Sequence, residues 1–519
     1  MTHFQPKPIN HVVVVGGGNA GFLSALSLRI LVPGLNVTVV HSSKIPVIGV
    51  GESTTAAIPR FIHGTLGLDQ GIFYDQVHPT WKLGLRFIWG DPRDSHFNYT
   101  FEPFMGTQPE GFSKPFSYHC LSGINDACMS SALMNTGKAP CNVTRDGSIV
   151  PHEHLAYHID NHRFIAYLAD RAQRTGVQVI DATVQGVRQD DSGFIESLIL
   201  EDGQTLSGDL FVDCSGFASR LLGKVMNEPF VSYGDSLFCD HAVIGSWRRT
   251  DEPINPYTTV ETMNHGWCWR IELEDRITRG YVHSSAFCSL DEARDELLAK
   301  NPQIEGDTQV IGFQCGRYAN AWNKNVVAIG NSAGFIEPLE ATALHLICDQ
   351  IWFLANTLID SERRLMDKAI DLENKRFRIM FDGVRDFLDV HYKFNRRLDT
   401  PFWQQCRNDI SLHGAKDFVD YYREAGPSLL GGVTLDAQDV FGVHGYLTML
   451  LGQRVPTKYA FNPSTEEQWR WNLHRQTNAD RADSGISVKQ ALAIIHHPKF
   501  EWPIRGIDRP RANPYYPAT

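Results

Sequence analysis

The junction between an apolar run at residues 11–15 and the sequence Gly-Gly-Gly-Asn-Ala-Gly constrains the fold more than any other feature of the chain. Gly16, Gly18 and Gly21 have the GxGxxG spacing. The β-branched run predicts a strand, and residues 22–28 have the apolar spacing of a buried helix. In such a turn the glycines permit a tight bend, close approach of a pyrophosphate and close helix packing. The sequence therefore predicts a dinucleotide-binding strand-turn-helix.

The first βαβ unit closes with a second strand at residues 36–41, about 20 residues after the glycines, where an acidic residue usually holds the ribose. His41 occupies that position. A second strand and glycine turn lie at residues 325–344, about 300 residues later. A distributed site of this kind favours FAD over NAD, because an NAD enzyme needs only the contiguous N-terminal half.

Composition excludes several classes of function. The chain has 519 residues, 42% hydrophobic and 21% charged, with a net charge of −11 and no basic stripe, which argues against nucleic-acid and membrane partners. Its ten cysteines include no CxxC pair, as expected for reduced thiols. We see no signal segment and no apolar run of about 20 residues, so we expect a cytoplasmic protein.

The chain pattern predicts an α/β fold with a discontinuous FAD-binding Rossmann-like domain of the flavin monooxygenase type. Further strands are expected at residues 177–184, 209–214 and 326–329, separated by long insertions. The expected FAD-binding domain joins residues 1–64, 151–234 and 321–345. Residues 65–150 and 235–320 are expected to form an inserted sheet and substrate region, and residues 346–519 a mostly helical substrate-side portion.

Five segments together resemble the flavin-dependent halogenases of the tryptophan halogenase family over nearly the whole chain. They are the GGGNAG turn, the segment IPVIGVGES at residues 45–53, WKLGLRF at 81–87, GWCWRI at 266–271 and EPLEAT at 337–342. The lysine segment and the WxWxI element are the most diagnostic, because related flavin hydroxylases lack them. Asn331, where many hydroxylases place an acidic residue, fits the same pattern.

The resemblance implies a two-stage chemistry that uses FADH2, O2 and a halide. Flavin hydroperoxide oxidises bromide or chloride to hypohalous acid, which passes through a tunnel to Lys82 beside an aromatic substrate. Glu340 would stabilise the cationic ring and accept its proton, and the backbone amides of Thr342 and Ala343 would hold the halide. The alternatives without a catalytic role are a solvated Lys82 on a strand and a position of either Glu337 or Glu340 at a helix N-terminus. Glu337, three residues earlier, would lie on the same side if the segment were helical.

The resemblance also assigns cofactor and tunnel residues. Trp267 and Trp269, two apart on a predicted strand, should point to one face and keep the substrate away from the flavin, although core packing alone would explain them. The family motif ends in Pro where this chain has Glu272, and shows Ser and Gly where it has Ala341 and Ala343, which leaves halide preference open. The expected FAD-binding residues are Gly16, Gly18, Asn19, Ala20, Gly21, Ser42, Ile45, Val50, Gly51, Glu52, Ser53, Val184, Gly330, Ile336 and Leu344.

The substrate is expected to be indole or a substituted or larger indole. Phe104 resembles in position an aromatic residue that sandwiches the indole ring. The polar residues that grip free tryptophan in the family are not recognisable near residues 441–450, and an unpaired buried zwitterion would be costly. The segment at residues 451–456 is similar to a subgroup that accepts indole and favours bromide, so we expect bromide to be favoured over chloride.

Alternative functions remain open from the sequence. An aromatic flavin monooxygenase that hydroxylates its substrate is the main rival, and a non-catalytic flavoprotein scaffold is the second. His152, His154 and His158 have a spacing that a metal could use, but no carboxylate or cysteine completes a site, and we expect no metal there. No second dinucleotide fingerprint is evident, so a separate flavin reductase should supply FADH2. A homodimer is left open.

Overall fold

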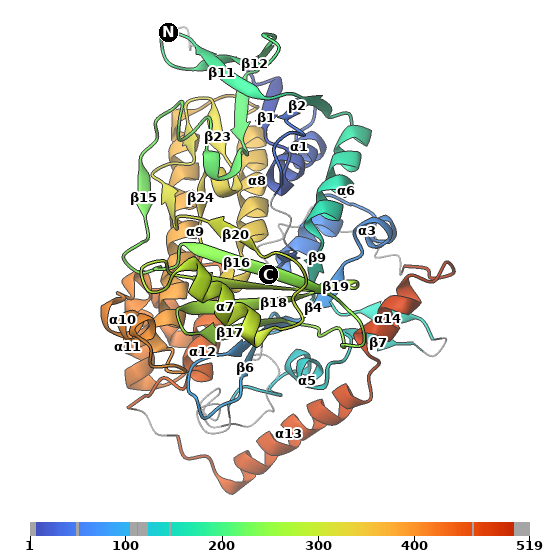
Figure 1. Ribbon diagram of the computed structural model, residues 1–519, viewed down its shortest axis with the longest axis vertical. Coiled ribbons are helices and arrows are strands. Elements are labelled where there is room, and N and C mark those ends of the chain that lie inside the picture. Colours follow the sequence, from blue (N-terminus) through green and yellow to red (C-terminus); the bar gives the residue numbers. More distant parts are fainter. Residues whose placement is uncertain are drawn as a thin grey trace.

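The computed structural model describes residues 7–47, 51–103, 112, 123–144, 147–458 and 461–502. Figure 1 shows the N-terminal elements and a first sheet at one end, a second sheet across the middle and a helical C-terminal part around it. The predicted α/β fold is confirmed. The longer helices are α1 (Asn19–Leu31), α3 (Gln70–Val77), α5 (Met129–Thr136), α6 (Asn161–Arg174), α7 (Leu290–Lys300), α8 (Ala343–Asp360), α9 (Asp367–Phe394), α10 (Pro401–Asp409), α11 (Lys416–Ala425), α12 (Gly442–Gly452), α13 (Thr465–Asp483) and α14 (Val488–Ile495).

The first sheet has six strands in the order β10-β2-β1-β14-β23-β22, parallel except for the last pair. On β1, Val12 and Val14 belong to the same apolar core as α1 and α8, whereas Val13 and Val15 pack into the core on the other face. Both faces are therefore covered, as an apolar parallel strand requires. The strands are β1 (His11–Val15), β2 (Asn36–His41), β10 (Gln178–Asp181), β14 (Leu210–Asp213), β22 (Trp322–Asn323) and β23 (Val326–Ala328).

One strand prediction in this region was wrong. Residues 177–184 were expected as a single strand, but β10 ends at Asp181 and a separate strand starts at Val184. That second strand pairs within a three-stranded antiparallel sheet instead of continuing the parallel one. The apolar pattern does not reveal the break because both pieces alternate in the same way. This smaller sheet contains β11 (Val184–Gln189), β12 (Ile195–Leu200) and β13 (Thr205–Ser207).

The second large sheet has seven strands in the order β20-β16-β19-β18-β17-β5-β6. It is antiparallel except for the parallel pair of β17 and β5, which joins two distant stretches of the chain. Its strands are β5 (Gly84–Ile88), β6 (Phe97–Thr100), β16 (His241–Arg248), β17 (Thr258–Met263), β18 (Gly266–Glu272), β19 (Arg276–His283) and β20 (Gln309–Gly312).

A short antiparallel sheet, β3-β9-β4, lies between the regions that the two large sheets form. Thr80 and Ser53, from β4 and β3, both pair with His158 on the central strand, so segments far apart in sequence meet here. The strands are β3 (Glu52–Ser53), β4 (Thr80–Lys82) and β9 (Ala156–Ile159). The remaining small sheets are formed by β7 (Cys141–Val143) with β8 (Ile149–Pro151), and by β15 (Phe230–Ser232), β21 (Gly316–Tyr318) and β24 (Gly334–Phe335).

From α8 onward the described chain is helical, as expected. Helix α9 carries an apolar face into the main core, and α13 runs along the outer edge of the molecule in Figure 1. The helices within the described ranges are all too short or too polar to cross a bilayer.

Candidate active site

A cavity of about 890 Å³ opens at the glycine turn between β1 and α1. A Cβ on Gly16 would lie 2.2 Å from the Cys214 carbonyl oxygen, and one on Gly21 would lie 1.9 Å from the Gly16 carbonyl oxygen. A Cβ on Gly18 would meet nothing within 4 Å. The turn is therefore closed on its core side and open on its cavity side, where amides at the start of α1 are available to a phosphate group.

Most of the expected cofactor residues line this cavity. Three of them are not part of the cavity lining. Gly21 packs against the turn itself, and Gly330 and Ile336 also lie outside the lining. At Gly330, where φ is +71°, a Cβ would lie 3.2 Å from that of Ala20, so the second glycine turn packs directly on the first. Val50 lies outside the described residues. The lining includes Gly16, Gly18, Asn19, Ala20, Ser42, Ile45, Gly51, Glu52, Ser53, Val184 and Leu344.

Trp267 and Trp269 also line the cavity, with their ring centroids 5.9 Å apart, so the prediction of one shared face agrees with the structure. The Trp267 indole nitrogen donates a hydrogen bond of 2.7 Å to Glu337. Their strand ends at the buried Glu272, which pairs with Arg249 at 2.5 Å and with Arg270 at 2.8 Å. The departure from proline at this position is therefore compensated by two guanidinium groups.

Lys82 ends strand β4 and is fully buried, so the alternative of a solvated surface lysine is not what the structure shows. Its Nζ donates a hydrogen bond of 2.9 Å to the Thr54 carbonyl oxygen and lies 5.1 Å from the centroid of the Phe101 ring. Burial lowers the pKa of the Lys82 ammonium from 10.5 to about 7, and the nearby Glu340 carboxyl partly opposes this. Ammonium and free amine are both accessible near neutral pH.

Glu340 ends a short 3-10 turn that begins at Pro338, and its carboxyl is buried. His391, near the end of α9, places its Nε2 2.5 Å from a Glu340 oxygen, and its Nδ1 lies 2.8 Å from the Phe387 carbonyl oxygen. Because Nδ1 donates to that carbonyl, Nε2 is the ring nitrogen that faces Glu340. Burial raises the pKa of Glu340, and His391 and Lys82 oppose that rise.

Glu337 and Glu340 do not lie together, because the chain enters the 3-10 turn only after Glu337. Glu337 accepts hydrogen bonds from Trp267 and from the Tyr392 hydroxyl, the latter at 2.5 Å. Its other oxygen has no partner among the described residues. Burial raises the pKa of Glu337 to about 7, opposed by those two donors. The two carboxyls would share one side only if the segment were helical, and Glu337 lies outside the 3-10 turn that ends at Glu340.

The expected halide residues lie at the start of α8. Ala343 lines the cavity, but Thr342, which is buried, does not. The backbone bend that brings them there is at Ala341, with φ +57° and ψ +36°, a left-handed conformation that non-glycine residues rarely adopt. Ala343 itself has ordinary helical geometry, so the constraint falls on Ala341.

A hydrogen-bonded chain of side chains links the cavity to the lysine strand. Ser53, which lines the cavity, lies 2.7 Å from the Thr258 hydroxyl, and Thr258 lies 2.7 Å from Nε2 of the buried His158. The other ring nitrogen of His158 lies 3.3 Å from the hydroxyl of Thr80, on the same strand as Lys82. Sequence reasoning considered His158 only as a metal ligand and missed this connection, which depends on the register of β3, β9 and β4.

Aromatic residues lie next to His391 on the side away from the cavity. Phe387 stacks on Phe441 with centroids 3.8 Å apart, and Tyr99 lies 6.2 Å from Phe387 and 6.0 Å from His444. These residues come from β6, α9 and the start of α12, and sequence reasoning identified only the segment that contains Phe441 and His444. Phe104, the expected stacking residue, lies outside the described residues.

Comparison with known proteins agrees with this geometry. A family model described as tryptophan halogenase matches residues 11–466. The tryptophan 6-halogenase ThaL of Streptomyces albogriseolus is 33% identical over 448 residues, which cover 81% of this chain and 83% of that protein. The crystal structure of MibH, a lanthipeptide tryptophan 5-halogenase, covers 97% of this chain and 98% of its own at 36% identity, with a TM-score of 0.86.

A further solved structure is BrvH, a flavin-dependent halogenase from Brevundimonas sp. BAL3, which has a TM-score of 0.81 at 31% identity and covers 94% of this chain and 99% of its own. Membership of this family implies FAD, O2 and a halide as reactants, with the halide left undetermined. The chain belongs to the tryptophan halogenase family and is a flavin-dependent halogenase.

Proposed function

We propose that this protein uses FADH2, O2 and a halide to halogenate the indole ring of a substrate larger or less charged than free tryptophan, with Lys82 and Glu340 as its catalytic residues. One observation carries the proposal. Two buried groups of opposite charge type, an amine and a carboxyl, lie within electrostatic reach of each other beside an aromatic cluster and outside the cavity at the glycine turn. Such a pair is costly to bury and is typical of a catalytic site.

The cavity fits a flavin dinucleotide by its volume, its open Gly18 wall and its extension to the second glycine turn, and the FAD domain would combine residues 1–64, 151–234 and 321–345. When bound, the reduced flavin supplies, with O2, the oxidising equivalents that convert halide to hypohalous acid. Lys82 then holds the hypohalous acid at the substrate side. The ring forms a carbon–halogen bond as the halogen–oxygen bond breaks, the Lys82 ammonium gives a proton to the departing hydroxide so that it leaves as water, and Glu340 accepts the ring proton.

The side chains of α12, in the expected substrate-side portion, support an indole over free tryptophan. Helix α12 carries no acidic or basic side chain other than His444, and burial lowers the pKa of His444 to about 4, so it is neutral at physiological pH. A zwitterion would have no strong counter-charge on this helix. The printed description of MibH as a lanthipeptide halogenase is consistent with a substrate in which the amino and carboxyl groups are in peptide bonds.

We propose bromide as the favoured halide. Its support is the similarity of residues 451–456 to bromide-preferring relatives and the position of Ala343, the first residue of α8, at the cavity wall. A larger anion loses less hydration energy on entering a buried site than chloride does. Hydroxylation is disfavoured because Trp267 and Trp269 occupy the cavity wall where a substrate would need to stand.

The deciding experiment combines the protein with FAD, a separate flavin reductase, NADH and either indole, free tryptophan or a tryptophan-containing peptide. Parallel reactions contain bromide, chloride or no halide, and products are identified by mass spectrometry. We expect brominated indole or peptide as the main product and little halogenated tryptophan. An oxygenated product without halide would support the hydroxylase, and efficient turnover without the reductase would overturn the expected need for a partner.

A further inference from the structure

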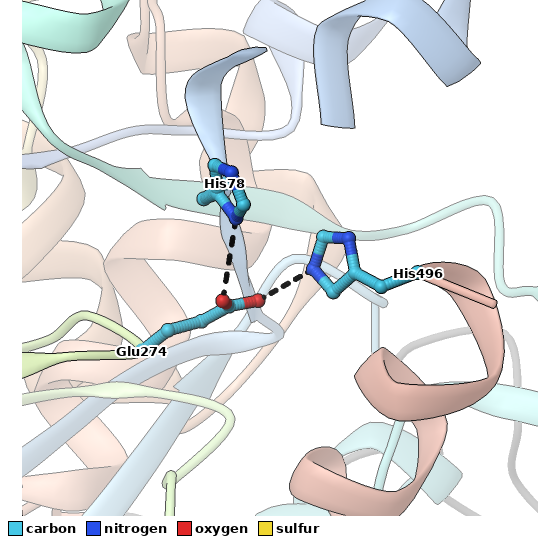
Figure 2. Close-up of side chains that lie close together, drawn as sticks. All are labelled: His78, Glu274 and His496. Atoms are coloured by element: carbon cyan, nitrogen blue, oxygen red, sulfur yellow. Dashed lines mark hydrogen bonds and ion pairs between the residues drawn. The ribbon is translucent and has the colours of Figure 1, made fainter. Parts of the chain in front are cut away.

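A cluster of two histidines and one glutamate lies on the outside of the molecule, away from the cavity. His78 ends α3, Glu274 lies in the turn between β18 and β19, and His496 ends α14. Figure 2 shows the Glu274 carboxylate between the two imidazoles, with each of its oxygens directed at one ring. The His78 Nδ1 lies 3.5 Å from one oxygen and the His496 Nε2 lies 2.8 Å from the other.

The donor atoms of this cluster match the coordination chemistry of zinc. One atom from each residue can be chosen so that all three lie within 4.8 Å of one another. Ligand atoms 2.0–2.1 Å from a tetrahedral ion are about 3.3 Å apart. Side-chain rotations that move the donor atoms by about an ångström therefore complete the geometry. The exposed fraction of the side chain is 37% for His78, 27% for Glu274 and 25% for His496. This partial exposure leaves room for a water ligand.

The side chains of the cluster offer a divalent cation both negative charge and neutral nitrogen donors. Glu274 forms its ion pairs with the two histidines, and Asp75 adds negative charge near His496. A divalent ion placed here would meet one carboxylate oxygen and two imidazole nitrogens, a donor set that suits metals of the zinc class. A second acidic and histidine cluster, Asp386, Asp389 and His413, differs because Arg385 already pairs with Asp386 at 2.6 Å.

We propose that His78, Glu274 and His496 bind a divalent transition-metal ion of the zinc class, with solvent in the remaining position. The ion would tie α14 to the strand that carries Lys82. His78 lies two residues before β4, and the carbonyl of Glu272, two residues before Glu274, accepts a hydrogen bond from the Thr80 hydroxyl. The metal therefore stabilises the segments that pack against β4, the strand that ends at Lys82, and takes no part in the chemistry at the cavity.

The test uses the full-length protein after treatment with a chelator, titrated with ZnCl2 by isothermal calorimetry and with CoCl2 by absorption spectroscopy. We expect one site in the wild type, a cobalt spectrum without a thiolate charge-transfer band, and a higher melting temperature with zinc. His496→Gln and Glu274→Gln should each weaken zinc binding at least tenfold, which is about 1.4 kcal/mol. His497→Gln, which removes the adjacent imidazole, is the matched control and should bind zinc as the wild type does.

Circular dichroism and FAD binding establish that each variant is folded. Zinc binding of equal affinity in wild type and both cluster variants would overturn the site, as would no binding by the wild type. A thiolate band in the cobalt spectrum would also overturn it, because the ligands would then include cysteine. If a variant does not fold, the cobalt spectrum of the wild type decides alone, since imidazole and carboxylate ligands give a tetrahedral or five-coordinate spectrum without that band.

Discussion

Glu337 and Glu340 belong to one four-residue motif, yet the structure gives them opposite environments. Glu337 is held by two neutral donors, Trp267, which lines the cavity, and Tyr392. Glu340 is held by His391 and lies within electrostatic reach of Lys82. Their partners are consecutive residues of α9, so one helix end positions both carboxyls.

This difference shows how one motif can hold a carboxyl with a structural role, Glu337, and a carboxyl with a catalytic role, Glu340. Neutral donors stabilise Glu337 without supplying a charge, and its pKa of about 7 makes the protonated form accessible. Burial raises the pKa of Glu340 as well, but there His391 and Lys82 oppose the rise and so favour the carboxylate form that a base requires. The following five substitutions test this division.

Lys82→Ala should produce the largest effect. We expect halogenation to fall by more than about 10³-fold, because the group that presents the oxidised halogen is lost. FAD binding and oxygen consumption should persist, since Lys82 does not line the cavity. Product formation is measured by mass spectrometry and oxygen uptake by electrode, with the exposed Lys368→Ala as the control. Retained product would show that the assignment of Lys82 is wrong.

Glu340→Gln and Glu337→Gln form a matched pair that tests the comparison directly. The first should lower kcat by about 10²- to 10³-fold, because it removes a base and a charge next to the ring. The second should change kcat by less than about threefold, because an amide oxygen can still accept from Trp267 and Tyr392. Equal losses in both variants, measured with saturating halide and reductase, would contradict the division of roles.

His391→Leu should shift the pH profile and also lower the rate. Burial raises the pKa of Glu340 and the His391 hydrogen bond lowers it, so removing the imidazole raises that pKa further. Activity requires the carboxylate, so the acid limb of kcat should move to higher pH, with a loss of about tenfold near neutrality. His474→Leu is the control, because that ring lies on α13, where it bonds to the Ala127 carbonyl and to Asn478 and stacks on Trp471 instead of contacting Glu340. A profile that keeps its acid limb would assign His391 to packing alone.

Tyr392→Phe should have the smallest effect. It removes the hydroxyl that donates to Glu337, so the free energy of unfolding should fall by about 1–2 kcal/mol, while kcat changes little. Chemical denaturation checks stability, and the halogenation assay checks activity. A large loss of kcat with unchanged stability would place Glu337 in the chemistry and end the distinction from Glu340.

Much of the fold could be predicted because its signals are local. The glycine spacing at Gly16, Gly18 and Gly21 predicted the first turn, and apolar runs identified most strands of the six-stranded sheet. The seven-stranded sheet was expected only as an insertion, with one strand located from Trp267 and Trp269. The break at residues 177–184 was missed because both pieces have the same apolar pattern but pair in different sheets. The 3-10 turn that ends at Glu340 was missed because, over a few residues, a helix and a 3-10 turn have similar spacing of side chains.

The sequence by itself determined the chemical groups: a glycine turn for phosphate, a lysine, two carboxyls and two tryptophans at strand spacing. Only the tertiary structure decided which of these become reactive. Burial of Lys82 and the contact of Glu340 with His391, 51 residues away, set their protonation, and no local pattern encodes either one. The reason is physical: a pKa depends on desolvation and on charges within a few ångströms, and those arise only when distant segments pack together.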